Sequence, residues 1–164
     1  LRGGDVNGTG SAGTGGQFNW NNAGDDGVLF HYGTMDISGG NSSGGAGGGT
    51  DLTTLRTTDN VFINGTILVN GGNGATTGGN GGGAAGFGGG ILRIGFNLAG
   101  VVHLGNNAVI RSNGGSGATP GAAGFIELDP SGAAPNPALM ENTGAVVTTN
   151  TGAGTAVPGN VYRD

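Results

Sequence analysis

The sequence predicts an all-β protein, a parallel β-solenoid (β-helix) of about four coils that carries long glycine-rich excursions. Three observations favour this fold class. Glycine makes up 43 of the 164 residues, far above the usual share of about 7%, and it costs roughly 1 kcal/mol relative to alanine inside a helix. Apolar residues form short runs bounded by turn residues, and one sequence pattern recurs along the chain.

The apolar runs indicate strands that pack into a core. The chain is 34% hydrophobic and only 9% charged, whereas disordered chains are poor in apolar residues and rich in charge. Collagen needs glycine at every third position and abundant proline, but this chain has 5 prolines and its longest glycine tract, residues 71–90, keeps no such register. The runs are Val28–Phe30, Val61–Ile63, Ile67–Val69, Ile91–Ile94, Val101–Val102 and Phe125–Leu128.

An internal repeat appears when the segments that lead into the glycine-rich tracts are aligned. Residues 33–40, 65–72, 108–115 and 145–152 match one another, and the end of the pattern recurs at positions 3, 39, 71, 114 and 151. The period is therefore about 37 residues, with the length varying mainly in the glycine-rich tract. We expect one repeat domain over residues 1–164, with repeats at about 1–38, 39–70, 71–113 and 114–150 and a partial repeat at 151–164.

Each repeat is expected to contain an apolar strand, a Gly-Gly turn, a glycine-rich excursion and a second strand. The second strands fall at residues 17–20, 51–55, 91–94, 125–128 and 160–163, so Arg93 and Glu127 occupy equivalent positions of adjacent repeats. Stacking the repeats predicts three columns of side chains. The inward column is Met35, Ile67, Ile110 and Val147, and the outward column is Asp36, Leu68, Arg111 and Thr148. The third column lies at a turn and consists of Asn70, Asn113 and Asn150.

Two structural questions stay open at this point. An antiparallel β-sandwich is the alternative fold, because Asn64-Gly65 is a good hairpin signal. The glycine-rich excursions can be mobile loops, or they can pack side by side as extended polyglycine segments, since only glycine lets neighbouring backbones approach so closely. We expect partial order.

One combination of segments resembles a known kind of protein. Residues 65–72, Gly-Thr-Ile-Leu-Val-Asn-Gly-Gly, are followed by a Gly/Asn/Ala tract and then by the strand Gly-Gly-Ile-Leu-Arg-Ile at residues 89–94. This is similar to the glycine-rich β-helical repeats of large bacterial surface and secreted proteins, adhesin-like and autotransporter-passenger-like chains among them, and loosely to the Gly-Gly-Asn-rich mycobacterial surface family. The resemblance covers about residues 1–155. It implies an extracellular, non-enzymatic role in adhesion or structure.

Charge and composition exclude several classes of partner. The chain has 5 basic and 10 acidic residues, a net charge of -5, and no cysteine. Nucleic acid is not expected as a partner because phosphate binding needs clustered basic residues. The runs are too short for a membrane span. A disulfide framework and a thiolate metal site are both impossible. The basic residues are single, scattered arginines: Arg2, Arg56, Arg93, Arg111 and Arg163.

Sequence motifs for catalysis or cofactor binding are weak evidence of function in a chain so rich in glycine. Gly-x-Gly-x-x-Gly occurs at Gly8, Gly10 and Gly13 and again at Gly81, Gly83 and Gly86, but a dinucleotide site also needs a helix to follow. Residues 40–44 match Gly-x-Ser-x-Gly, yet a nucleophile elbow needs a strand-to-helix turn. His31 and His103 are predicted to point out of their strands and not to share a column, so a zinc site is not expected.

We therefore expect no catalytic, cofactor-binding or metal-binding residues. Calcium is the one cofactor left open, through Asp25-Asp26 and Asp129, whose default role is turn capping. Asn7, Asn41 and Asn64 begin formal N-glycosylation sequons. Trp20, Tyr32 and Phe87 are the candidates for stacking on sugars, but they form no obvious platform in the sequence, and Phe87 is expected to pin its excursion to the body.

The predicted function is structural or adhesive, as the subunit of a filament or matrix or as a segment of a large surface protein at an extracellular or cell-surface location. The alternative is a β-helix that binds or cleaves glycans, of the phage-tailspike kind, although a cleavage site would gather carboxylates and the chain has only Glu127 and Glu141 as glutamates. Ice binding is a third hypothesis, disfavoured because the threonine pairs do not align. Neither end of the repeat array has the sequence of a cap, so end-to-end self-association is expected, with surface glycans as a further class of partner.

Overall fold

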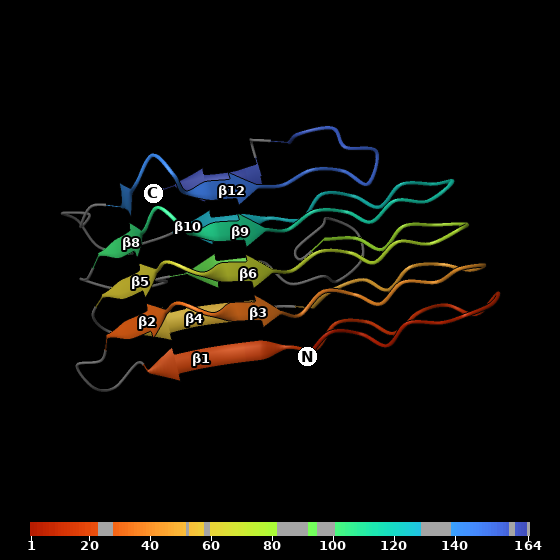
Figure 1. The fold of residues 1–164 in the computed structure, drawn as a ribbon, viewed down its shortest axis with the longest axis horizontal. Coiled ribbons are helices and arrows are strands. Elements are labelled where there is room, and N and C mark those ends of the chain that lie inside the picture. The colour runs from red at the N-terminus through yellow and green to blue at the C-terminus, as the bar shows by residue number, and fades with distance from the viewer. Residues whose placement is uncertain are drawn as a thin grey trace.

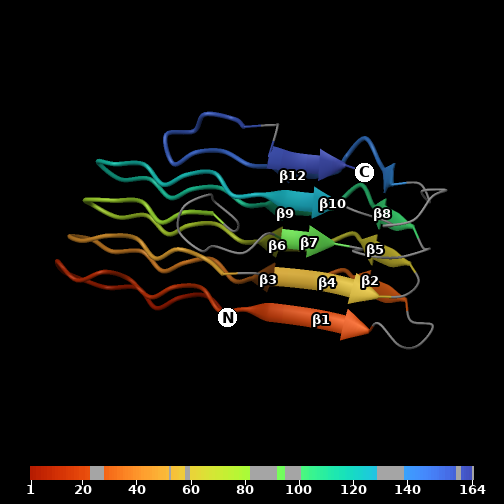
Figure 2. The same ribbon diagram turned by 180° about the vertical axis from the view of Figure 1, so that it is seen from behind.

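A computed structural model of the chain describes residues 1–22, 28–51, 53–57, 60–81, 92–94, 101–128, 139–157 and 160–163. Short strands, turns and extended segments make up this part of the chain, and no α-helix occurs in it. The all-β prediction is therefore confirmed. The strands lie in three sheets, and long glycine-rich segments extend from the strands toward one side of the molecule (Figures 1 and 2).

All three sheets are parallel, and each takes strands from successive repeats in chain order. We number the sheets by their order along the chain. Sheet 1 contains β1 (Phe18–Asn22), β4 (Thr53–Thr57), β7 (Leu92–Ile94), β10 (Ile126–Leu128) and β13 (Val161–Arg163). Sheet 2 contains β2 (Leu29–His31), β5 (Val61–Ile63), β8 (Val102–Leu104) and β11 (Met140–Glu141). Sheet 3 contains β3 (Thr34–Asp36), β6 (Thr66–Leu68), β9 (Val109–Arg111) and β12 (Val146–Thr148).

The predicted register is confirmed in sheets 1 and 3. Met35 pairs with Ile67, Ile67 with Ile110, and Ile110 with Val147. Ile67 and Ile110 are fully buried, as an inward column requires. Arg93 also pairs with Glu127 in sheet 1. Because side chains alternate along a strand, a slip of one residue would have turned these columns outward.

Sheet 2 was not predicted from the sequence, whose repeats were assigned too few strands. Two strands were assigned to each repeat, whereas the structure has three, and the extra strands coincide with the apolar runs at residues 28–30, 61–63 and 101–102. Asn64-Gly65 is a corner between β5 and β6, which belong to different sheets, so the hairpin interpretation is wrong. The antiparallel sandwich is wrong as well, since neighbouring strands run parallel in all three sheets.

A single hydrophobic core lies between the three sheets. It draws buried side chains from each sheet, such as Leu55 from sheet 1, Ile63 from sheet 2 and Ile67 from sheet 3. Burying each of these side chains contributes about 1.5–3 kcal/mol. This core holds the strands of successive repeats in register and so fixes where their outward side chains lie.

The glycine-rich segments form ordered arms, at residues 1–16, 38–50, 70–81 and 113–124. In each arm an outgoing and a returning segment run beside each other, and equivalent arms lie side by side (Figure 1). Gly3 N–H donates to the Ser38 carbonyl and Val6 N–H to that of Asn41, so the bonding repeats every three residues. Three residues per turn is the repeat of polyproline II, and the side-by-side packing that the sequence left open is present.

A continuous line of backbone hydrogen bonds crosses the stacked arms and joins outgoing to returning segments. Gly13 N–H donates to the Gly4 carbonyl at 2.9 Å, and Gly40 N–H donates to the Gly13 carbonyl at 2.9 Å. The line continues through Gly48, Gly72, Gly79, Gly115, Gly121 and Gly152. A Cβ on Gly72 would collide with the Gly40 carbonyl oxygen, so the close approach of the arms requires glycine there.

The two ends of the stack differ in how they close the core. In sheet 1, the inward column of Leu55, Ile94 and Leu128 begins at Trp20 and finishes at Arg163. In sheet 2, the column of Ile63 and Leu104 begins at His31 and finishes at Glu141. We call these two ends the β1 end and the β13 end.

The β13 end carries a polar cap. Arg163 Nε donates to Glu141 Oε2 at 2.8 Å and Nη2 donates to Oε1 at 3.0 Å, so a bidentate ion pair lies at the end of the apolar columns. This hydrogen bonding raises the pKa of Arg163. The loop at residues 149–157 also folds back on itself, with Val157 N–H donating to the Thr149 carbonyl. The expectation that neither end is capped is wrong at this end.

The β1 end exposes apolar surface instead. Trp20 is 46% exposed although it occupies an inward column, and Leu1 is 70% exposed. Phe18 and Met35 are only partly buried against the core. β1, β2 and β3 are edge strands, so each leaves one row of backbone groups without a neighbouring strand in the described part of the chain.

Candidate functional site

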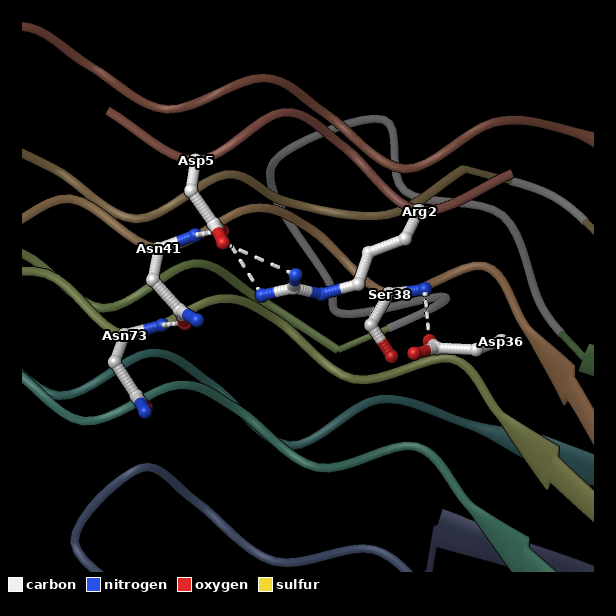
Figure 3. A network of polar contacts seen from close by, with 6 residues as sticks. All are labelled: Arg2, Asp5, Asp36, Ser38, Asn41 and Asn73. Carbon is white, nitrogen blue, oxygen red and sulfur yellow. Dashed lines mark hydrogen bonds and ion pairs between the residues drawn. The ribbon is translucent and has the colours of Figure 1, made fainter. Parts of the chain in front are cut away.

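Two surfaces gather polar or aromatic side chains: one on the outgoing segments of the arms, and one on sheet 2. The first carries columns of Asx and Ser residues that connect each repeat to the next (Figure 3). Asn41 N–H donates to Asp5 Oδ1 at 2.7 Å, Asn73 N–H to Asn41 Oδ1 at 2.8 Å, and Ser116 N–H to Asn73 Oδ1 at 2.9 Å. Each side chain thus accepts a backbone hydrogen bond from the following repeat.

The second column on the arms is the asparagine column that the sequence predicted. Asn113 N–H donates to Asn70 Oδ1 at 2.9 Å and Asn150 N–H donates to Asn113 Oδ1 at 2.8 Å. The side chains bond along the stacking direction, as expected, although the donor is the backbone rather than a second amide. These columns are three residues apart along the arm, which matches the three-residue turn.

Asp5 begins the first Asx column and is the only charged member of it. Arg2 donates to its carboxylate from Nη2 at 2.9 Å and from Nη1 at 3.2 Å. The hydrogen bond from the Asn41 backbone, followed by that from Arg2, lowers the pKa of Asp5. The arm face around this column is a shallow polar depression whose members already bond to the fold, so we assign it a structural role.

The other surface is a groove of about 480 Å³ at the carboxyl ends of the sheet 2 strands. Its floor is a column of outward side chains in which Phe30 pairs with Phe62 and Phe62 with His103. Tyr32 extends the column past the end of β2. Phe30 is 57% exposed and Tyr32 66% exposed, so large apolar rings face solvent here. We call this surface the aromatic groove.

The rings of the aromatic groove pack on one another. Phe30 stacks on Phe62 with ring centroids 5.0 Å apart and planes 11° apart, and Tyr32 stacks beside Phe30 at 6.2 Å. His103 meets Phe62 edge to face, at 5.6 Å and 78°. These contacts hold the rings in fixed positions, and each such pair contributes about 0.5–1.5 kcal/mol beyond burial.

Asparagines line the rim of the aromatic groove at the corners that follow β5, β8 and β11. They are Asn64, Asn106, Asn107 and Asn142. Asn64 Oδ1 accepts a hydrogen bond from Asn107 N–H at 3.0 Å, which fixes the Asn64 amide. No Asp, Glu, Lys or Arg is among the described residues that line this groove. The groove therefore combines an apolar floor with an uncharged, hydrogen-bonding rim.

The residues of the catalytic and cofactor-binding motifs lie outside this groove or have structural roles. Ser42, the serine of the Gly-x-Ser-x-Gly match, is buried, donates to the Gly10 carbonyl at 2.7 Å and accepts from Gly45 N–H at 2.9 Å. Its hydroxyl thus joins two arms. Gly8, Gly10 and Gly13 lie in the first arm, where no helix follows. Gly83, Gly86, Phe87, Asp25, Asp26 and Asp129 lie outside the described residues.

The histidines occupy different columns, as predicted, but only one of them faces outward. His103 belongs to the aromatic floor. His31 pairs with the buried Ile63, so it lies in the inward column, and its Nε2 is 3.1 Å from the Thr66 carbonyl oxygen. The prediction that both histidines point outward is therefore wrong for His31. In the described part of the chain, no group of three or more His, Asp or Glu side chains is placed to hold a metal ion.

The sugar-stacking candidates lie in different parts of the fold. Tyr32 lies in the aromatic groove, whereas Trp20 lies in an inward column at the β1 end. Phe30, Phe62 and His103 were not among the predicted site residues. Each occupies the middle position of a three-residue strand, with apolar neighbours on both sides of Phe62 and His103 and on one side of Phe30, and this position would have revealed the column had sheet 2 been recognised.

Comparisons with known proteins do not extend these assignments. No protein-family model matches the sequence, and no curated protein or solved structure matches it either. No helix in the described ranges is long and apolar enough to cross a membrane.

Proposed function

We propose that the chain is a structural or adhesive module of an extracellular or cell-surface protein. In this proposal the three sheets are the sides of a closed parallel β-solenoid, and the module joins a neighbouring layer of the same architecture through its β1 end. Stacked repeats form a durable rod that carries few reactive side chains, which suits a structural role.

The observation that carries the proposal is the asymmetry of the inward columns. All three columns are buried in the middle of the stack. At the β13 end two of them finish on the Arg163–Glu141 ion pair and the third finishes on the partly buried Val147, whereas at the β1 end the sheet 1 column reaches solvent through Trp20. An apolar core face with open strand edges favours the addition of another layer.

The same asymmetry favours a segment of a large surface protein over the subunit of an endless filament. A filament that grows head to tail needs two complementary open ends, and a layer added at the β13 end would cover a polar cap. Both ends have edge strands, but the β1 end combines them with an exposed aromatic side chain in an inward column, so we favour a junction there. We therefore propose that a further layer joins the module at its β1 end.

Gly4 provides the test. It belongs to the glycine column of Gly40, Gly72 and Gly115, where an added Cβ would collide with the carbonyl oxygen of the preceding arm, but a Cβ on Gly4 itself meets nothing within 4 Å. Gly4→Ala should therefore leave the isolated fold intact and obstruct a layer that stacks on the β1 end. Trp20→Asp is a second variant, because it places a carboxylate on the apolar end.

Light scattering over a wide concentration range should show association of the wild-type chain and weaker association of both variants, with thermal unfolding of Gly4→Ala unchanged. A wild-type chain that stays monomeric throughout would overturn the proposal. So would variants that associate as strongly as the wild type.

A further inference from the structure

The exposed aromatic side chains of the aromatic groove are not explained by a structural role of the rod. An outward face of a solvated sheet is expected to be polar, yet the middle of sheet 2 presents Phe30, Phe62 and His103 in one column, with Tyr32 beside them and Met140 following at 52% exposure. Monomeric proteins seldom expose contiguous apolar surface without a use for it.

The ring contacts arrange this surface before anything binds. Phe30 stacks between Tyr32 and Phe62, and His103 is held against the Phe62 ring. A ligand therefore loses little affinity to ordering these side chains, which is the main cost that flexible aromatic residues would impose. The floor is consequently suited to shallow contact with a flat, partly apolar ligand.

The rim determines the chemistry of that ligand. Asn64, Asn106, Asn107 and Asn142 offer amide groups, and no Asp, Glu, Lys or Arg is among the lining residues that the structure describes. Amides donate and accept hydrogen bonds equally, so the rim fits a ligand with many hydroxyl groups. Among these described lining residues, no Lys or Arg is present to pair with a carboxylate, sulfate or phosphate on the ligand.

We propose that the aromatic groove binds a neutral saccharide. The C–H face of a sugar ring packs on aromatic rings, whose faces carry partial negative charge, while its hydroxyl groups reach the asparagine rim. Tyr32, at 66% exposure, is the ring with the largest free surface. This inference extends the adhesive role in the proposed function. It rests on that proposed function, in which the module holds a surface ligand.

The experiment is calorimetric titration of the full chain with neutral hexasaccharides of glucose, mannose and N-acetylglucosamine. Heparin and polygalacturonate serve as charged probes. Tyr32→Ala and Phe62→Ala are expected to weaken binding of the best neutral sugar at least tenfold. Tyr162→Ala is the matched control, since Tyr162 is also an exposed aromatic that stacks on a phenylalanine, but it lies in sheet 1. It should leave affinity unchanged.

Three results would overturn the inference: no binding of any neutral hexasaccharide, tighter binding of the charged probes, or equal loss in the control variant. Circular dichroism of each variant establishes that it has folded, and Tyr32→Phe, which keeps the ring, should restore most of the affinity. Light scattering of the same variants separates the two proposals. A Tyr32→Ala chain that loses self-association instead of sugar binding would identify the groove as a contact between copies.

Discussion

Single side chains in this protein work mainly by accepting backbone hydrogen bonds from the next repeat. Asn41, Asn70, Asn73 and Asn113 all do so through Oδ1. Every backbone N–H needs an acceptor, so an Asx side chain at the right position replaces a strand partner in the arms. Asp5 does the same for Asn41 and adds the ion pair with Arg2.

Asp5→Asn tests which of these two contacts matters. The hydrogen bond from Asn41 and the pairing with Arg2 lower the pKa of Asp5, so its contribution to stability is fully present above the ordinary pKa of about 3.9. It is lost as the pH falls through the lower pKa of the folded state. Asparagine keeps the acceptor and cannot titrate. We expect Asp5→Asn to unfold at nearly the wild-type temperature at neutral pH and to lose this part of the acid destabilisation.

The measurement is thermal unfolding from neutral pH down to about pH 2. Asp5→Ala is the comparison, because it removes the acceptor as well as the charge, and it should be less stable than Asp5→Asn at neutral pH. Equal stability of the two variants there would mean that the hydrogen bond from Asn41 contributes nothing measurable.

At the scale of the elements, the arms behave as rods of polyproline II type that are joined through glycine. Gly115 N–H donates to the Gly79 carbonyl and the Gly115 carbonyl accepts from Gly121 N–H. A Cβ at Gly115 would collide with the carbonyl oxygen of Gly72 in the neighbouring arm. The backbones must therefore separate, or the hydrogen bonds must lengthen, to admit even a methyl group.

Gly115→Ala is expected to cost about 1–3 kcal/mol, as other overpacked sites do. Gly4→Ala, in the same column, has free space for its Cβ and should be neutral or stabilising by about 0.4–1 kcal/mol, since alanine restricts the unfolded chain. Urea denaturation of the two variants checks the difference. If both lost the same stability, the close packing of the arms would not be what requires glycine at Gly115.

The strands divide into those that the sequence predicts and those that it does not. Alignment of the repeats predicted the inward column of Met35, Ile67, Ile110 and Val147. It also predicted that Arg93 pairs with Glu127. Sheet 2 was missed because its strands are joined to those of sheet 3 by short corners, of two residues after β2 and β5 and of four residues after β8 and β11. A corner this short is indistinguishable in sequence from a hairpin turn, and only the parallel partner strands decide between them.

The aromatic groove and the cap could not be predicted for a related reason. Phe62 and His103 become neighbours only through the register of β5 and β8, and Arg163 meets Glu141 from a different sheet. Neither pair has a local spacing that signals contact. In contrast, the asparagine column was predictable, since Asn70, Asn113 and Asn150 recur at the same position of each repeat.

At the scale of the whole molecule, the polarity of the two ends determines whether copies of the rod can stack end to end. The sheet 1 column opens at Trp20, and the sheet 1 and sheet 2 columns would finish on apolar side chains at the β13 end if Arg163 and Glu141 were apolar. Partly exposed ion pairs are worth only about 0–1 kcal/mol, and Arg163 is 40% exposed in its side chain. Replacing the pair should therefore leave the fold intact while removing the polar cap.

The double variant Glu141→Leu with Arg163→Leu is thus expected to polymerise head to tail, because an apolar β13 end can meet the apolar β1 end of a second copy in parallel register. Its particle size should rise with concentration without limit, and electron microscopy should show filaments where the wild type shows none. Adding Gly4→Ala should abolish the filaments by obstructing the β1 end. A double variant no larger than the wild-type protein would mean that the ion pair is not what closes this end, and the limit to growth would then lie in the folded-back loop at residues 149–157.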